Sequence, residues 1–231
     1  RELYEIAFRE VFGRDLPQPG SMAGRTDRAI ALEVLTLAGV PDPQRQVAAF
    51  QAVMAAHAPA LADAVRERAR VLPGAAQALT ALRDGQAGPE VVQSVLTGNM
   101  RPLAEVKLGP LGLTEHLDLN AGAYGDAHEV RAELVPLARA SAARGYGGDF
   151  AGAATVLIGD TPLDVAAALS TGARAVGVAT GSFTTADLAT AGAHVVLPDL
   201  TDTEEVLAAI LGPRPAPIPA PTDSVGESST A

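Results

Sequence analysis

The chain has 231 residues, a formal net charge of −10 at pH 7, no cysteine, no tryptophan and 48% hydrophobic residues. This composition excludes a disulfide framework, a thiolate metal site and a disordered chain, and the acidic balance with only 3% aromatic residues argues against nucleic acid as a partner. No apolar run is long enough to span a bilayer, and no signal peptide opens the chain. We therefore expect a soluble, cytoplasmic globular protein with no membrane partner.

The segment from residue 1 to residue 72 is predicted to be entirely helical. Apolar residues recur at helical spacing in four stretches, at 3–11, 30–37, 47–57 and 61–69. Gly13 ends the first stretch, and Thr26 or Asp27 is expected to cap the second. Pro59 separates the third stretch from the fourth. No strand pattern occurs in this segment.

Residues 73–211 alternate between strand and helix patterns. Continuous apolar runs predict strands at 91–96, 154–158, 175–178 and 194–197, with a short strand near 117–119. Helical patterns lie between them, at 74–82, 102–111, 130–143, 162–170, 186–190 and 204–211. Repeated strand–helix units with apolar strands predict a parallel sheet covered by helices on both faces, which is an α/β fold.

The last region, residues 212–231, is rich in proline. Proline occupies every second position from Pro213 to Pro221. This spacing forbids a helix and favours an extended, solvated chain. We expect a disordered tail here.

Acidic side chains follow the predicted strand that ends at Ile158. The acidic residues are Asp160 and Asp164, with Thr161 between them, and ligands of open α/β sheets lie beyond the carboxyl ends of the strands. Thr161 and Asp164 fit a capping box of the next helix, which leaves Asp160 unexplained. Two neighbouring carboxylates repel each other, and Mg²⁺ binds one or two carboxylates with waters and phosphate oxygens. A magnesium site is therefore the alternative to the capping box.

The predicted strand that ends at Leu96 is followed by Thr97-Gly98-Asn99. One interpretation is a strand-to-helix turn in which Gly98 supplies an unusual backbone angle. The other is a phosphate seat, in which the Thr97 hydroxyl and the backbone amides at the start of the next helix bind an anion.

Together the two strand ends resemble the haloacid dehalogenase (HAD) superfamily, in its phosphoglycolate-phosphatase-like branch with a helical cap. Residues 95–99 (Val-Leu-Thr-Gly-Asn) resemble its second motif, and residues 156–164 (Val-Leu-Ile-Gly-Asp-Thr-Pro-Leu-Asp) resemble its fourth. Supporting likenesses occur at residues 72–74, 178–181 and 194–199. The resemblance implies a Rossmann-like, three-layer parallel-sheet core at residues 73–211 and an all-helical cap at residues 1–72.

The resemblance also implies a Mg²⁺-dependent phosphatase of small phosphorylated metabolites. An aspartate on the first strand of the family's sheet attacks a phosphate monoester and forms an aspartyl-phosphate. Thr97, with Gly98 and Asn99, would hold the transferring phosphoryl group. Asp160 with Asp164 would hold the Mg²⁺ ion.

A lysine or arginine neutralises the phosphate charge in this family, often as a Lys-Pro pair that this chain lacks. Arg131 stands at the corresponding position, and the alternative for it is a surface pair with Glu129 or Glu133. Lys107 is nearer the second motif, but within a predicted helix a solvated surface role is favoured for it. Arg25 lies in a stretch that resembles the family's cap–core interface, where it would meet an anionic substrate. A loop and helix cap is the alternative there.

The family's first motif, Asp-x-Asp-Gly-Thr on an apolar strand, does not occur in the 231 residues. We expect it to lie upstream of Arg1, so that the central first strand is missing between the strands that lead to Thr97 and Asp160. A gap of about 10 Å, two strand spacings, would then separate these strands, and the chain alone would be inactive and poorly stable. The alternatives are a non-catalytic scaffold that has lost the motif and a receiver-like phosphoryl-accepting module.

Overall fold

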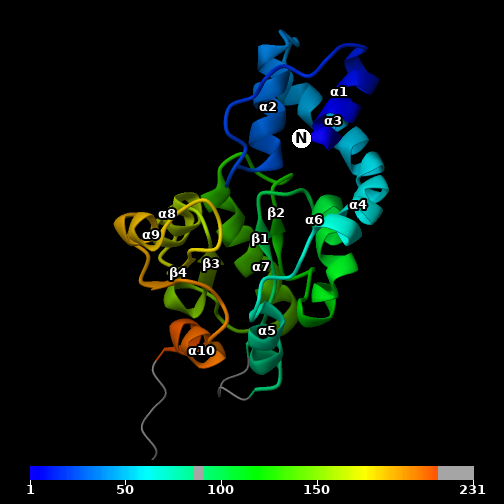
Figure 1. Cartoon of the computed structure of the whole chain (residues 1–231). Coiled ribbons are helices and arrows are strands. Elements are labelled where there is room, and N and C mark those ends of the chain that lie inside the picture. The colour runs from blue at the N-terminus through cyan, green and yellow to red at the C-terminus, as the bar shows by residue number, and fades with distance from the viewer. Residues whose placement is uncertain (86–90, 213–231) are drawn as a thin grey trace, which may run out of the picture.

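The computed structural model describes residues 1–85 and 91–212. The predicted disordered tail lies outside the described residues from position 213 onward. Figure 1 shows a group of helices from the N-terminal segment at one end of a core of strands and helices. Within the described ranges, no helix is long and apolar enough to cross a membrane.

The N-terminal segment is helical, as predicted. Its helices are α1 (Glu2–Phe12), α2 (Asp27–Leu37), α3 (Pro43–His57) and α4 (Ala62–Arg68), with a 3₁₀ helix at Ala58–Leu61. Gly13 ends α1 in the left-handed region at φ 63°. Thr26 caps α2, because its hydroxyl oxygen accepts a hydrogen bond of 3.1 Å from the Ala29 amide.

One hydrophobic cluster holds these helices together. Its largest fully buried side chains are Phe8, Leu35, Phe50 and Met54. The predicted apolar face of α1 is only partly buried, since Leu3 and Ala7 are in the core but Ile6 and Val11 are 39% and 42% exposed. Tyr4 and Phe8 face inward instead and pack their rings near that of Phe50. Aromatic rings bury a large surface, which favours an inward position for these two residues.

The same cluster extends into the core. Leu103 on α6 (Arg101–Leu108) and Met100 just before this helix are both buried in it. Hydrophobic packing therefore crosses the boundary that the sequence places at residue 72. It fastens the N-terminal helices to the helix that follows the Thr97 loop.

The strands of the described residues form two separate parallel sheets. β1 (Leu96–Thr97) pairs with β2 (Ala123–Tyr124), and β4 (Arg174–Val178) lies between β3 (Val156–Gly159) and β5 (Val195–Leu197). The strand predicted at 91–96 is too long, because the chain before Leu96 makes only isolated contacts such as the bond from the Asp118 amide to the Gln93 carbonyl. The strand expected near 117–119 is wrong, since the partner of β1 is formed by residues 123–124.

Helices cover both faces of the three-stranded sheet, which confirms the predicted three-layer α/β fold. Val176 and Val178 of β4 pack with α5 (Ala75–Arg83) and α10 (Thr203–Leu211). Ala175 points to the opposite face, where α8 (Pro162–Ser170) and α9 (Thr185–Thr190) contribute Val165 and Leu188. α7 (Leu134–Tyr146) packs beside β1 and β2. The remaining 3₁₀ helices are Gly109–Leu111, Leu113–His116, Arg131–Glu133 and Gly152–Ala154.

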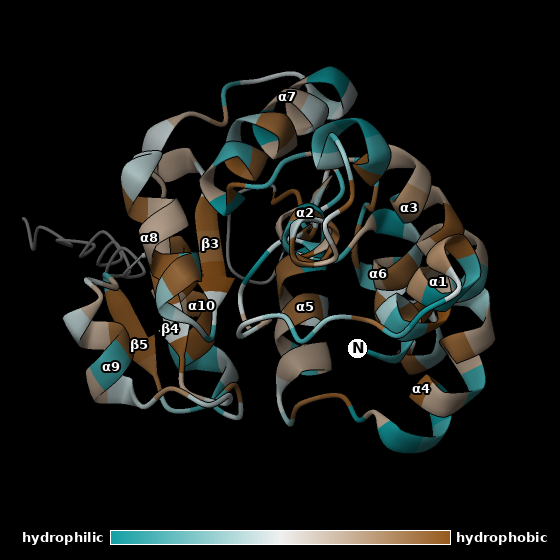
Figure 2. Cartoon of the chain, turned by 90° about the horizontal axis from the view of Figure 1, so that it is seen from above, coloured by the Kyte–Doolittle hydropathy of each residue, from teal (hydrophilic) through white to brown (hydrophobic). Residues whose placement is uncertain are grey.

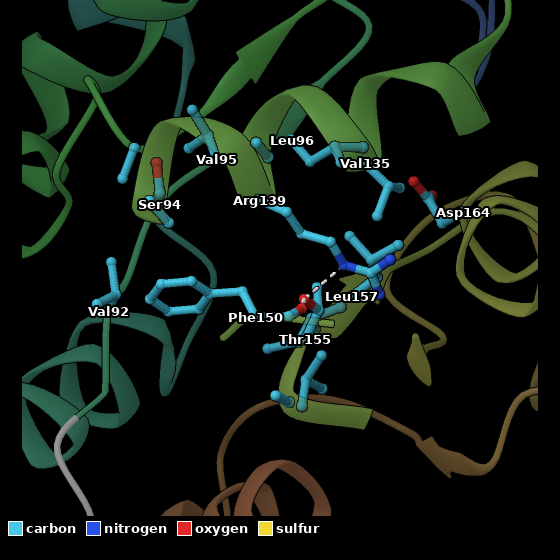
Figure 3. A pocket seen from close by; sticks show the side chains of 16 residues that line it. Val92, Ser94, Val95, Leu96, Val135, Arg139, Phe150, Thr155, Leu157 and Asp164 are labelled. Atoms are coloured by element: carbon cyan, nitrogen blue, oxygen red, sulfur yellow. Dashed lines mark hydrogen bonds between the residues drawn. The ribbon is translucent and has the colours of Figure 1, made fainter. Parts of the chain in front are cut away.

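A largely apolar groove of about 220 Å³ separates β1 from β3. Figure 3 shows this groove with Val95 and Leu96 on one side, Thr155 and Leu157 on the other, and Arg139 reaching from α7 toward Thr155. No backbone hydrogen bond joins β1 to β3 among the residues that the structure describes, so each strand is paired along one edge only. The sheet is thus interrupted between the two strands, at the place where the sequence predicts a gap.

Candidate functional site

A cavity of about 430 Å³ lies where β1 and β3 end. In the view from above in Figure 2, α2 lies in the middle, β3 on one side of it and α6 on the other. The cavity is lined by every site residue predicted from the sequence: Arg25, Thr97, Gly98, Asn99, Lys107, Arg131, Asp160 and Asp164. The fold therefore brings together side chains that lie far apart in the chain, because parallel strands deliver their carboxyl ends to one edge.

The loop after β1 is a tight turn with a free hydroxyl proton. The Thr97 hydroxyl oxygen accepts hydrogen bonds from the backbone amide of Asn99 at 3.1 Å and from its side-chain amide at 3.0 Å. Both bonds are accepted, so the hydroxyl proton remains available to donate to an anion. A Cβ at Gly98 would lie 2.1 Å from the Arg25 carbonyl oxygen, so only glycine fits this turn. The strand-to-helix turn and the phosphate seat, which binds an anion, are thus compatible interpretations of the same loop.

Arg131 lies on the 3₁₀ helix before α7 and reaches into the cavity. Its Nη2 is 2.6 Å from Asp164 Oδ1, and the two side chains are only 15% and 11% exposed. The expected alternative, a surface pair with Glu129 or Glu133, is wrong because the guanidinium pairs with Asp164 instead. Its Nε is buried and has no hydrogen-bond partner among the described residues. A buried N–H without a partner is suited to an anionic ligand.

The capping box at the start of α8 is confirmed. The Thr161 hydroxyl accepts the Asp164 amide at 3.3 Å, and Asp164 Oδ2 accepts the Thr161 amide at 3.1 Å. The other carboxylate oxygen of Asp164 pairs with Arg131. Both oxygens are therefore engaged by protein groups.

Asp160 lies exposed at the tip of β3, and it has no hydrogen bond or ion pair within the part of the chain that the structure describes. Its Oδ2 lies against Gly181, where a Cβ would come within 2.2 Å of it. No group of three acidic or histidine side chains gathers among the described residues. Mg²⁺ needs only one or two carboxylates beside water and phosphate oxygens. Asp160 fits that requirement as it stands, whereas Asp164 fits only after releasing Arg131 or Thr161.

Lys107 on α6 also belongs to the cavity. Its amine donates a hydrogen bond of 2.9 Å to Asn99 Oδ1, although much of the residue is exposed. Partial burial of the amine lowers the pKa of Lys107, and the nearby Asp27 carboxylate acts in the opposite direction. Both predicted cations, Lys107 and Arg131, therefore line the same cavity.

Arg25 lines the cavity, but its guanidinium turns toward α2. Nη1 lies 2.5 Å from Glu33 Oε2. Hydrogen bonds from the Gly20 amide and from Arg25 lower the pKa of Glu33. The Arg25 side chain is thus occupied by the helical region, which favours the loop-and-cap interpretation over a substrate contact.

Comparison with known proteins identifies the fold. Residues 130–203, which include Arg131, Asp160 and Asp164, match the family model described as HAD-hydrolase-like. A hydrolase from Pseudomonas syringae has 20% identity and a TM-score of 0.60, with 90% of each chain covered. A predicted phosphatase from Clostridium acetobutylicum has 14% identity and a TM-score of 0.56, with 91% of this chain and 89% of that chain covered. A predicted phosphoglycolate phosphatase from Haemophilus somnus 129PT has 16% identity and a TM-score of 0.55, with 89% and 88% covered.

The chain has a HAD-like fold. No protein with a curated function matches its sequence. At these identities the structural likeness concerns the fold, and the resemblance read from residues 156–164 agrees with the family model over that stretch.

Two residues that line the cavity of this HAD-like fold, Tyr4 and Asp27, could not be identified as a pair from the sequence. Asp27 is 5% exposed, and its Oδ1 accepts a hydrogen bond of 2.7 Å from the Tyr4 hydroxyl. Burial raises the pKa of Asp27, and the hydrogen bonds from Tyr4 and from the Met100 amide oppose this shift. Burial also raises the pKa of Tyr4. In the sequence, Asp27 is only a possible helix cap and Tyr4 is only a residue of an amphipathic helix, so their contact follows from the packing of both α1 and α2 against α3.

Proposed function

We propose that this chain provides the cap and most of the core of a Mg²⁺-dependent phosphatase of small phosphate monoesters. The observation that carries the proposal is the convergence of Thr97, Arg131, Lys107 and Asp160 in one cavity at the carboxyl ends of parallel strands. The HAD-like fold and the hydrolase family model support it. Two similar structures, named as a predicted phosphatase and a predicted phosphoglycolate phosphatase, also support it.

Each residue has a distinct task in this proposal. The Thr97 hydroxyl donates to a phosphoryl oxygen, and Arg131 and Lys107 offset the negative charge of the transferring group. Asp160 would hold Mg²⁺, which when bound supplies further positive charge and orients the phosphate. Asp164 orients Arg131 through their ion pair of 2.6 Å.

The proposed reaction also needs a nucleophile, and the 231 residues contain no Asp-x-Asp-Gly sequence. In the proposal, the nucleophilic aspartate forms an aspartyl-phosphate and stands at the end of an additional strand between β1 and β3. The groove there is bordered by two strand edges without backbone partners in the described residues, and both strands lead into the cavity. The 231-residue chain by itself would then have no phosphatase activity.

The test compares this chain with a version extended at its N-terminus by an apolar strand that ends in Asp-x-Asp-Gly-Thr. We expect Mg²⁺-dependent hydrolysis of p-nitrophenyl phosphate by the extended version alone. Replacing the first aspartate of the added strand by asparagine should abolish the activity, and so should removal of Mg²⁺ with a chelator. Equal hydrolysis by both versions would refute the proposal.

A binding measurement separates this proposal from a non-catalytic scaffold. Calorimetric titration with inorganic phosphate in the presence of Mg²⁺ should show binding, and Thr97→Val should weaken it about tenfold through loss of one hydrogen bond to a charged group. Thr190→Val, at an exposed position at the end of α9, is the matched control and should bind like the wild type. Absence of phosphate binding by the wild type would favour the scaffold.

A further inference from the structure

Asp27 holds the loop after β1 on both sides of Asn99. The backbone amide of Asp27 donates a hydrogen bond of 2.6 Å to the Gly98 carbonyl. Its side-chain Oδ2 accepts a bond of 2.6 Å from the backbone amide of Met100. One residue at the start of α2 therefore fixes both the beginning and the end of the turn that carries Asn99.

Neighbouring backbone contacts reinforce this connection. The Gly125 amide donates a hydrogen bond of 2.9 Å to the Asn99 carbonyl, and the Arg28 amide donates one of 2.8 Å to the Gly125 carbonyl. A Cβ at Gly125 would lie 1.8 Å from the Gly98 carbonyl oxygen, so the two loops touch. The backbone around Asn99 is thus enclosed between the start of α2 and the loop after β2.

The carboxylate of Asp27 is buried. A buried carboxylate is costly unless hydrogen bonds satisfy it. Here the direct partners are the Tyr4 hydroxyl and the Met100 amide, and the charged groups that face it are Lys107 and Asp126. For the packing of the helices alone, an apolar side chain of similar size would serve as well. What an apolar side chain lacks is an acceptor for the Met100 amide and for the Tyr4 hydroxyl.

We propose that Asp27 is a positioning residue for the anion seat: it holds the turn at residues 97–100 so that the Thr97 hydroxyl and the Asn99–Lys107 pair face the cavity. This inference rests on the proposed function, because residues 97–99 form a phosphate seat only there. It assigns the helical region a direct part in shaping the seat through α2. Asp27 itself does not touch the phosphate in this assignment.

The test uses two substitutions of similar size. Asp27→Asn keeps an oxygen that accepts the Met100 amide, whereas Asp27→Leu removes it. We expect Asp27→Leu to weaken the binding of inorganic phosphate, measured by calorimetry with Mg²⁺, about tenfold. Asp27→Asn should restore most of the affinity, and Tyr4→Phe should weaken binding only a few-fold. Rescue by asparagine is the result that a purely structural role of the site would not produce.

Asp187→Leu is the matched control. Asp187 is an exposed capping aspartate at the start of α9, so this substitution destabilises the chain without touching the cavity and should leave phosphate affinity unchanged. Equal affinities of the Asp27→Leu and Asp27→Asn variants would overturn the inference. If Asp27→Leu does not fold, an affinity of Tyr4→Phe equal to that of the wild type would overturn it.

Hydrogen exchange separates failure of this inference from failure of the proposed function. If the wild type binds no phosphate, the proposed function fails, and the exchange rate of the Met100 amide still tests the positioning contact. That amide should exchange faster in Asp27→Leu than in Asp27→Asn, at equal global stability. Identical exchange in the two variants would contradict the inference.

Discussion

The helical region and the α/β core of this chain are packed in different ways. The helices gather their large side chains into one cluster, with Phe8, Phe50 and Met54 fully buried. The core has two smaller clusters on the two faces of β4, made mostly of valine and alanine. Its strand β3 leaves Ile158 48% exposed beside the groove. The large side chains of the helical region therefore form one continuous cluster, whereas packing in the core is interrupted between β1 and β3.

This difference locates the candidate site. The cavity lies where the well-packed helices meet the interrupted core, and Asp164 lines both this cavity and the groove. Binding sites are commonly drawn from the less stable parts of a fold, while rigid neighbours hold their geometry. The helical region thus keeps rigid the loops that follow β1 and β3, two strands that are each paired along one edge only.

The largest expected effect is the difference in the free energy of unfolding between the Phe50→Ala and Ile158→Ala variants. Phe50 is 1% exposed in the helical cluster, so its truncation should lower the free energy of unfolding by about 3–5 kcal/mol. Ile158 is already half exposed beside the groove, and its truncation should cost less than about 1 kcal/mol. Urea unfolding followed by circular dichroism measures both values. Similar losses for the two variants would contradict the difference in packing.

A smaller effect concerns pH and the buried carboxyl of Asp27. Its pKa is raised in the folded chain by burial, so the folded state binds this proton more tightly than the unfolded state does. The stabilisation is complete below the unfolded pKa of about 3.9 and is lost as pH rises through the higher folded pKa. The free energy of unfolding of the wild type should therefore fall, relative to that of Asp27→Asn, as pH increases above about 4. A pH-independent difference between the two proteins would contradict the buried environment of Asp27.

The smallest expected effect compares two capping boxes of the core. Thr161→Ala and Thr184→Ala each remove a hydroxyl that accepts an amide at the start of a helix, and each should cost about 1 kcal/mol of stability. Only Thr161→Ala also removes a hydrogen bond to Asp164, the partner of Arg131. Phosphate affinity should therefore change in Thr161→Ala and remain at the wild-type value in Thr184→Ala. Equal affinities in both variants would show that the capping box at the site is independent of the anion seat.

Local patterns predicted the helices, their caps and the strand ends well. Thr26 and Thr161 are capping residues as expected, because a cap depends on residues three positions apart. The short strands were predicted less well. The partner of β1 lies at residues 123–124 rather than near 117–119, since pairing depends on how distant segments dock and a two-residue strand has no periodic pattern.

The sequence by itself determined the α/β class, the positions of Thr97 and Asp160 at strand ends and the absence of an Asp-x-Asp-Gly motif from these residues. These features depend on neighbours along the chain. Only the tertiary structure decided that Arg131 pairs with Asp164, that the Arg25 guanidinium turns to Glu33 and that Tyr4 meets Asp27. Which charged and polar side chains pair depends on the distance between them and on their burial. These two properties are set only when helices and sheets pack together.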